Sequence, residues 1–184
     1  MIYGEGIRLR APEREDLPRF VAWLNDPEVR ENLAMFLPIS MAQEENWFEE
    51  MIKRPGEEQP LVIDIQEKDD WLPIGNMGIF GINQISRSGE LGIMIGNKAY
   101  WNKGYGTRSI QLMLKHCFET LNLNRVQLIV YETNPRGIRC YEKVGFVHEG
   151  RMRQGYYKNG KYIDILMMGV LASEWPGLSK SRSE

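Results

Sequence analysis

The stretch Trp101-Asn-Lys-Gly-Tyr-Gly-Thr107 lies between a predicted strand and a predicted helix. Glycine has no Cβ, so Gly104 and Gly106 allow the backbone to approach a ligand closely. The first turn of the following helix also offers unpaired N–H groups and the positive end of its dipole. Together these features predict a site for an anion such as phosphate or pyrophosphate. A glycine-rich turn that only packs a helix against a strand remains an open alternative at this point.

Two other phosphate-binding motifs do not match this loop. A dinucleotide-binding fingerprint needs a third glycine three residues after Gly106, where this chain has Ser109. A P-loop needs glycine, lysine and then serine or threonine, and no such triplet follows the loop.

Hydrophobic periodicity predicts the elements on both sides of the loop. Upstream it predicts strands over Ile7–Arg10, Leu61–Ile65, Ile74–Ile82 and Glu90–Ile95, and helices around Leu17–Leu24 and after a capping box at Ser40–Gln43. Downstream it predicts a helix from about Lys103 to Leu121, a strand over Val126–Tyr131, a helix capped by Asn134 and ended by Gly145, and a hairpin that turns at Asn159-Gly160. The order predicts one α/β (α+β) domain over residues 1–175, with a polar tail over 176–184.

Composition and charge narrow the class of protein. A net charge of −2 gives no basic footprint for nucleic acid and argues against attraction to an anionic membrane. Two cysteines without close spacing, and two histidines without partners at ligand spacing, predict neither a disulfide framework nor a metal site. The N-terminus lacks the features of a signal peptide, and no apolar run is long enough to span a bilayer. We therefore expect a cytoplasmic protein.

A second constellation lies in Asn134-Pro-Arg-Gly-Ile-Arg-Cys-Tyr-Glu-Lys-Val-Gly-Phe146. Ile138 and Tyr141 are three residues apart and share a helix face, so Tyr141 is predicted to point inward. Arg136, Arg139 and Lys143 are predicted to reach solvent. A tyrosine hydroxyl in a cleft can hydrogen-bond a departing thiolate, but a core tyrosine bonded to backbone would fit the same pattern.

Taken together, these segments resemble the GNAT N-acetyltransferases. Glu90–Leu121 is similar to the strand, pyrophosphate loop and helix of that family. Val126–Phe146 is similar to its next strand and helix, with the pattern N-x-x-A/S-x-x-x-Y-E-K-x-G-F. The resemblance extends over nearly the whole chain. It is closest to the branch of ribosomal-protein N-terminal, spermidine and some aminoglycoside acetyltransferases, and implies a GNAT-like domain with a mixed, mostly antiparallel sheet flanked by helices.

The resemblance implies acetyl-CoA as cosubstrate and no metal. The pantetheine arm would pair with Met94, Ile95 and Gly96, and Asn134 would hydrogen-bond it. Tyr141 would approach the sulfur, and Lys143 or Arg139 would lie near the 3′-phosphate. The pyrophosphate would rest on the loop residues Trp101, Asn102, Lys103, Gly104, Tyr105, Gly106 and Thr107.

Two positions depart from the family pattern. Trp101 stands where the loop usually has Arg or Gln, so its side chain brings no charge and backbone N–H groups must carry more of the phosphate contact. Gly137 replaces a small Ala or Ser, which weakens the helix slightly and is expected to leave room for the cofactor.

The implied reaction is direct attack of a neutral amine on the acetyl thioester. Glu90 is the candidate base, acting through water, although a solvated carboxylate at a strand end is an equal alternative. The expected acceptor is a peptide or protein N-terminal amine. The alternatives are a small amine (a polyamine or an aminoglycoside) and a CoA-binding module without catalysis. A homodimer is also compatible with this branch.

Overall fold

The computed structural model describes residues 1–179, and its centre is one eight-stranded sheet in the order β1-β2-β3-β4-β5-β6-β8-β7. All neighbouring strands are antiparallel except β5 and β6, which confirms the mixed, mostly antiparallel sheet. The strands are β1 (Ile2–Gly4), β2 (Ile7–Arg10), β3 (Leu61–Glu67), β4 (Asp70–Asn83), β5 (Ser88–Ile95), β6 (Arg125–Tyr131), β7 (Val147–Lys158) and β8 (Lys161–Leu171).

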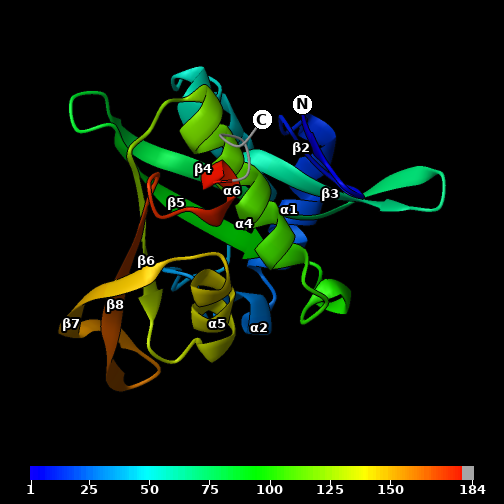
Figure 1. Ribbon diagram of the computed structural model, residues 1–184. Coiled ribbons are helices and arrows are strands. Elements are labelled where there is room, and N and C mark those ends of the chain that lie inside the picture. Colours follow the sequence, from blue (N-terminus) through cyan, green and yellow to red (C-terminus); the bar gives the residue numbers. More distant parts are fainter. Residues whose placement is uncertain (180–184) are drawn as a thin grey trace.

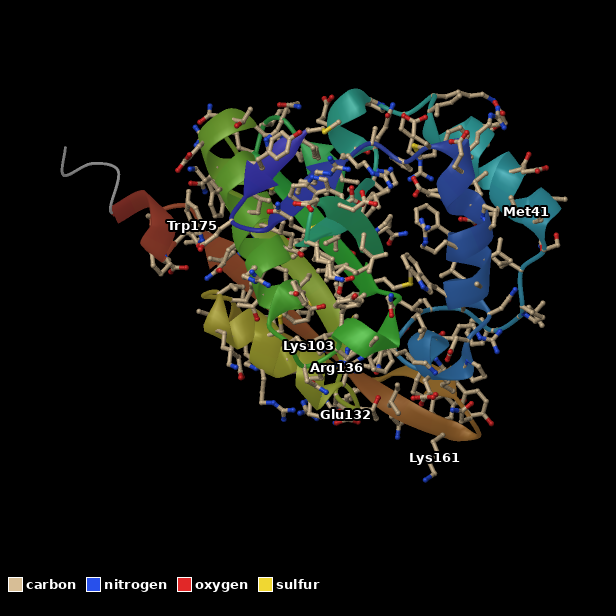
Figure 2. The ribbon with its side chains drawn as sticks, turned by 90° about the vertical axis from the view of Figure 1, so that its right-hand side faces the viewer. Met41, Lys103, Glu132, Arg136, Lys161 and Trp175 are labelled. Carbon is tan, nitrogen blue, oxygen red and sulfur yellow. The ribbon has the colours of Figure 1, made fainter. Side chains whose placement is uncertain are left out.

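Helices cover both faces of the sheet, with α4 on one face and α1 and α3 on the other (Figures 1 and 2). The α-helices are α1 (Leu17–Leu24), α2 (Pro27–Arg30), α3 (Met41–Met51), α4 (Tyr105–Lys115), α5 (Pro135–Lys143) and α6 (Pro176–Ser179). Shorter turns are η1 (Arg14–Asp16), η2 (Gly56–Glu58), η3 (Lys98–Tyr100) and the π-helical η4 (His116–Thr120). No helix in this described part is long and apolar enough to cross a membrane.

The helix predicted from about Lys103 begins two residues later, at Tyr105. Asn102 and Gly104 have φ angles of 60° and 80°, in the left-handed region that a right-handed helix cannot include. At the other end of the chain, α6 occupies the first four residues of the predicted polar tail. Residues 180–184 of that tail lie outside the described part.

Two clusters of buried side chains hold the layers together. On the α4 side, the helix stripe Ile110, Met113 and Leu114 packs on the sheet. On the other side, Phe20 of α1 and Phe48 of α3 pack over Val62 of β3. Burying one such side chain stabilises the fold by about 1.5–3 kcal/mol, so the amphipathic patterns of these helices decide where they lie.

The pairing of β5 with β6 is short. It covers only Ser88 with Arg125, Gly89 with Val126 and Glu90 with Gln127. Beyond these pairs β5 continues along β4 to Ile95, while β6 continues along β8 to Tyr131. The two strands therefore separate toward their carboxyl ends. Helices α4 and α5 follow β5 and β6 in the chain, so both start near this opening (Figure 1).

Candidate active site

The glycine-containing loop forms the start of α4. The Arg108 N–H donates to the Gly104 carbonyl at 3.1 Å, which is the first hydrogen bond of the helix ladder. The N–H groups of Tyr105, Gly106 and Thr107 precede that bond and have no acceptor inside the helix. An ideal Cβ on Gly104 would meet nothing within 4 Å, so space beside the loop is open. The loop therefore presents unpaired donors and a positive dipole end to a ligand.

These groups face a first cavity of about 260 Å³ between the α4 start and α5. Most of the predicted cofactor-binding residues line it: Ile95, Trp101, Asn102, Gly104, Tyr105, Gly106, Thr107, Asn134, Tyr141 and Lys143.

Three predicted cofactor-binding residues lie elsewhere. Lys103 is not in the wall, and its Nζ lies 5.2 Å from the centre of the Tyr100 ring. Met94 lines a second, adjoining cavity. Gly96 lines neither cavity, because the Trp23 ring lies directly against it and would overlap an added Cβ.

Gly137 lines the first cavity, but the space left by its missing Cβ is taken by Asn134. An ideal Cβ at this position would lie 2.6 Å from Asn134 Nδ2, so the Asn134 side chain fills the space. The Gly137 N–H donates to Asn134 Oδ1 at 3.0 Å, which caps α5 as the sequence predicted. The cap uses the amide oxygen of Asn134, a residue that also lines the first cavity.

Arg136 does not extend freely into solvent as predicted, because its side chain lies over Trp101. The guanidinium carbon is 3.7 Å from the centre of the indole ring, and Trp101 Nε1 donates to the Ile95 carbonyl at 2.7 Å. Burial lowers the pKa of Arg136 from its ordinary value. It forms no salt bridge within the described residues. Figure 2 shows Arg136 and Lys103 at the same end of the molecule.

Sequence reasoning missed the contact of Arg136 with Trp101, which follows from the packing of α5 against the start of α4. Arg136 precedes Cys140 by four residues, so both side chains lie on the same face of α5. Cys140 Sγ lies 3.3 Å from Thr107 Oγ1 in the first turn of α4. The face of α5 that bears Arg136 is therefore the face that packs against the phosphate-type loop.

The second cavity has a volume of about 270 Å³ and lies where β5 and β6 separate. Its walls come from both strands, from α5 and from the segment 32–34 that follows α2. Both candidate catalytic residues, Tyr141 and the exposed Glu90, line it. Asn32 also lines it, and its Oδ1 is buried without a hydrogen-bond partner in the described structure.

Tyr141 lies at the junction, because it lines both cavities. Its ring is held by an edge contact with Phe146, with ring centres 5.9 Å apart. Burial raises the pKa of the Tyr141 phenol above its ordinary value. The hydroxyl therefore stays protonated at neutral pH and can act as a hydrogen-bond donor toward a group placed between the cavities.

Metal chemistry has no evident ligands in this region. The described residues contain no group of three or more His, Cys, Asp or Glu side chains that could hold a metal ion. Neither histidine belongs to such a group. His148 Nε2 lies 3.1 Å from Glu142 Oε1 at the surface. His116 is partly buried, and burial lowers its pKa.

Comparisons with known proteins agree with this geometry. Residues 7–147 match the model of the acetyltransferase (GNAT) domain. The N-acetyltransferase p20 of Bacillus licheniformis is 29% identical over 178 residues, covering 96% of this chain and 98% of that protein. The spermidine N(1)-acetyltransferase of Vibrio cholerae is 32% identical over 170 residues, covering 92% and 95%.

A solved structure gives the same result for the fold. The spermidine N-acetyltransferase of Vibrio cholerae in complex with CoA and spermine superimposes with a TM-score of 0.84 at 29% identity, covering 93% of this chain and 98% of that one. The chain belongs to the GNAT acetyltransferase family and is an acetyl-CoA-dependent N-acetyltransferase.

Proposed function

We propose that the acetyl acceptor is the primary amine of a small molecule of the polyamine class, rather than the peptide or protein N-terminus that the sequence favoured. The observation that carries this proposal is the position of Tyr141 at the junction of two cavities, one with the anion-binding loop and one with Glu90 and Asn32. The similarity to a spermidine N(1)-acetyltransferase over 92% of the chain supports the small amine.

The second cavity has the chemistry that an amine needs. A carboxylate such as that of Glu90 accepts hydrogen bonds from an ammonium group. Asp26 and Glu28 both pair with Lys98, whose single positive charge offsets one of their two negative charges, and neither lines the cavity. Glu90 has no ion-pair or hydrogen-bond partner in the described part. The volume of about 270 Å³ is close to the lower end of small-ligand pockets, about 300 Å³.

For the cosubstrate, the first cavity offers groups suited to phosphates. The N–H groups at the start of α4 and the guanidinium of Arg136 would hold the pyrophosphate. Arg139 and Lys143 line the same cavity, and their positive charges are available to bind the 3′-phosphate. The free edge of β5 at Met94 and Ile95 would pair with the amide-bearing arm. Gly96 is not part of this proposal, since Trp23 covers it.

In this proposal acetyl-CoA supplies the acetyl thioester. The side chains of the protein accept a proton from the amine and donate a hydrogen bond to the departing sulfur. An alkylamine with a pKa near ~10.4 arrives protonated, so Glu90 would accept its proton, directly or through water. Tyr141 would donate a hydrogen bond to the departing sulfur. Because burial raises the pKa of Tyr141 while a thiol titrates near ~8.5, full transfer of its proton is uphill. Tyr141 therefore acts mainly as a donor that stabilises the thiolate.

The acceptor class is tested by free-thiol release from acetyl-CoA across spermidine, spermine, simple monoamines, aminoglycosides and N-terminal peptides. We expect turnover with the polyamines at rates well above those with peptides. Turnover on peptides alone would contradict the proposal. So would the absence of turnover on every small amine when titration calorimetry shows that acetyl-CoA still binds.

Tyr141→Phe removes the donor while keeping the ring that packs on Phe146. We expect kcat to fall by about 100-fold, within the range for loss of a positioned proton donor, while acetyl-CoA affinity changes little. Steady-state kinetics and calorimetry measure the two quantities. Tyr162→Phe, at a tyrosine that is 64% exposed, is the matched control and should behave as the parent. Parent-like kcat in Tyr141→Phe would remove Tyr141 from the mechanism.

Glu90→Gln keeps the shape of the side chain and removes its basicity. If Glu90 is the base, kcat/KM for the amine should fall by about 100-fold near neutral pH. The loss should shrink at high pH, where more of the amine is already neutral. The exposed Glu57 gives the control variant Glu57→Gln. A rise in amine KM with unchanged kcat and pH profile would instead assign Glu90 to binding alone.

Arg136→Ala tests the cation beside the loop. We expect the Kd for acetyl-CoA, measured by calorimetry, to rise about tenfold, which equals about 1.4 kcal/mol. The effect should be smaller for a CoA fragment that lacks the pyrophosphate. Arg54→Ala, at an exposed site away from both cavities, should leave the Kd unchanged. An unchanged Kd in Arg136→Ala would exclude a phosphate contact.

A further inference from the structure

Lys158, in the last position of β7, reaches a distant part of the chain. Its Nζ donates to the carbonyl oxygens of Arg30 at 2.7 Å, Glu31 at 2.7 Å and Leu33 at 3.2 Å. An ammonium has three donors, so these bonds use its full capacity. The lysine is half-buried, and burial lowers its pKa, with Glu31 opposing that effect.

The three carbonyls belong to the segment that forms one wall of the second cavity. They come just at and after the end of α2, where helix carbonyls have no partner within the helix. Asn32, Leu33 and Ala34 line the cavity, and the ammonium binds carbonyls on both sides of Asn32. Lys158 thus fixes the backbone on both sides of Asn32, in the segment whose residues 32–34 line the cavity.

The same hairpin contacts this wall a second time, through Tyr156. The Tyr156 ring stacks on that of Tyr131, another residue of the cavity, with centres 4.6 Å apart. Its distance to the Phe36 ring centre is 5.5 Å, so it bridges β6 and the segment after α2. Asn159 Nδ2 also lies 3.4 Å from Glu31 Oε2. The β7–β8 hairpin is therefore built against the acceptor side of the site.

We propose that Lys158 is a positioning residue for the amine acceptor: its three hydrogen bonds hold segment 30–33 in the conformation in which Asn32 and Leu33 line the cavity. This inference rests on the proposed function, because it assigns the second cavity to the acceptor. Lys158 touches neither cavity itself, and its effect on the acceptor passes through the backbone that it binds.

The variant Lys158→Met keeps most of the side-chain length and removes the three donors. We expect KM for spermidine to rise about tenfold, while kcat and the KM for acetyl-CoA stay within about twofold of the parent. Lys158→Arg restores a cation with several donors and should recover part of the loss. A parent-like spermidine KM in Lys158→Met, or an equal rise in KM for both substrates, would overturn the positioning role.

The matched control is Lys161→Met, at the residue that pairs with Lys158 across the hairpin. Figure 2 shows Lys161 at the hairpin tip, extending away from the molecule. Its variant should be parent-like in every measurement.

Hydrogen–deuterium exchange without substrate separates this inference from the proposed function. In Lys158→Met, exchange should become faster in segment 30–34 and remain unchanged in α4. If spermidine is not a substrate but exchange changes in this way, the proposed acceptor class is wrong. The result would still support the inference that Lys158 holds segment 30–33 in place. Unchanged exchange in segment 30–34 would overturn the inference that Lys158 holds this segment in place.

Discussion

The short pairing of β5 with β6 is the constraint on which the site depends. Three paired residues join the two halves of the sheet, and each strand then follows a different partner. The separation opens a gap in a sheet that is otherwise continuous. Helix α4 follows β5 and helix α5 follows β6, and both helices start near this gap. Backbone groups along such a gap need partners. The indole N–H of Trp101 supplies one, at the Ile95 carbonyl.

Trp101 and Arg136 form a stacked pair beside the loop at the start of α4. The indole gives no charge to a phosphate, but it provides a flat surface on which a guanidinium lies at 3.7 Å. A cation over an aromatic ring is worth about 0.5–2 kcal/mol, which is enough to favour one orientation of a long side chain. The loop and α5 are separate in sequence, but this contact brings the Arg136 cation to the cavity that the loop lines.

Local sequence signals predicted the framework well. Ser40 Oγ accepts from the Gln43 N–H at 3.2 Å, and Asn159 and Gly160 have the positive φ angles, 50° and 78°, of the predicted hairpin turn. The contacts of Arg136, the Trp23 ring over Gly96 and the reach of Lys158 to segment 30–33 join residues far apart in sequence, so no local pattern encodes them. The domain boundary at residue 175, the homodimer and the cytoplasmic location stay predictions.

The gap between β5 and β6 also leaves one edge of β5 unpaired in the interior of the sheet. Exposed edges on the outside of a sheet invite pairing with other chains and are a source of aggregation. Here the free edge of β5 is enclosed by α5, by β6 and by the segment after α2. The amide-bearing arm of the proposed cosubstrate would lie along this edge as an added strand. The fold thus places an unpaired strand edge inside the sheet, lined by the protein's own elements, and not at the outer margin of the sheet.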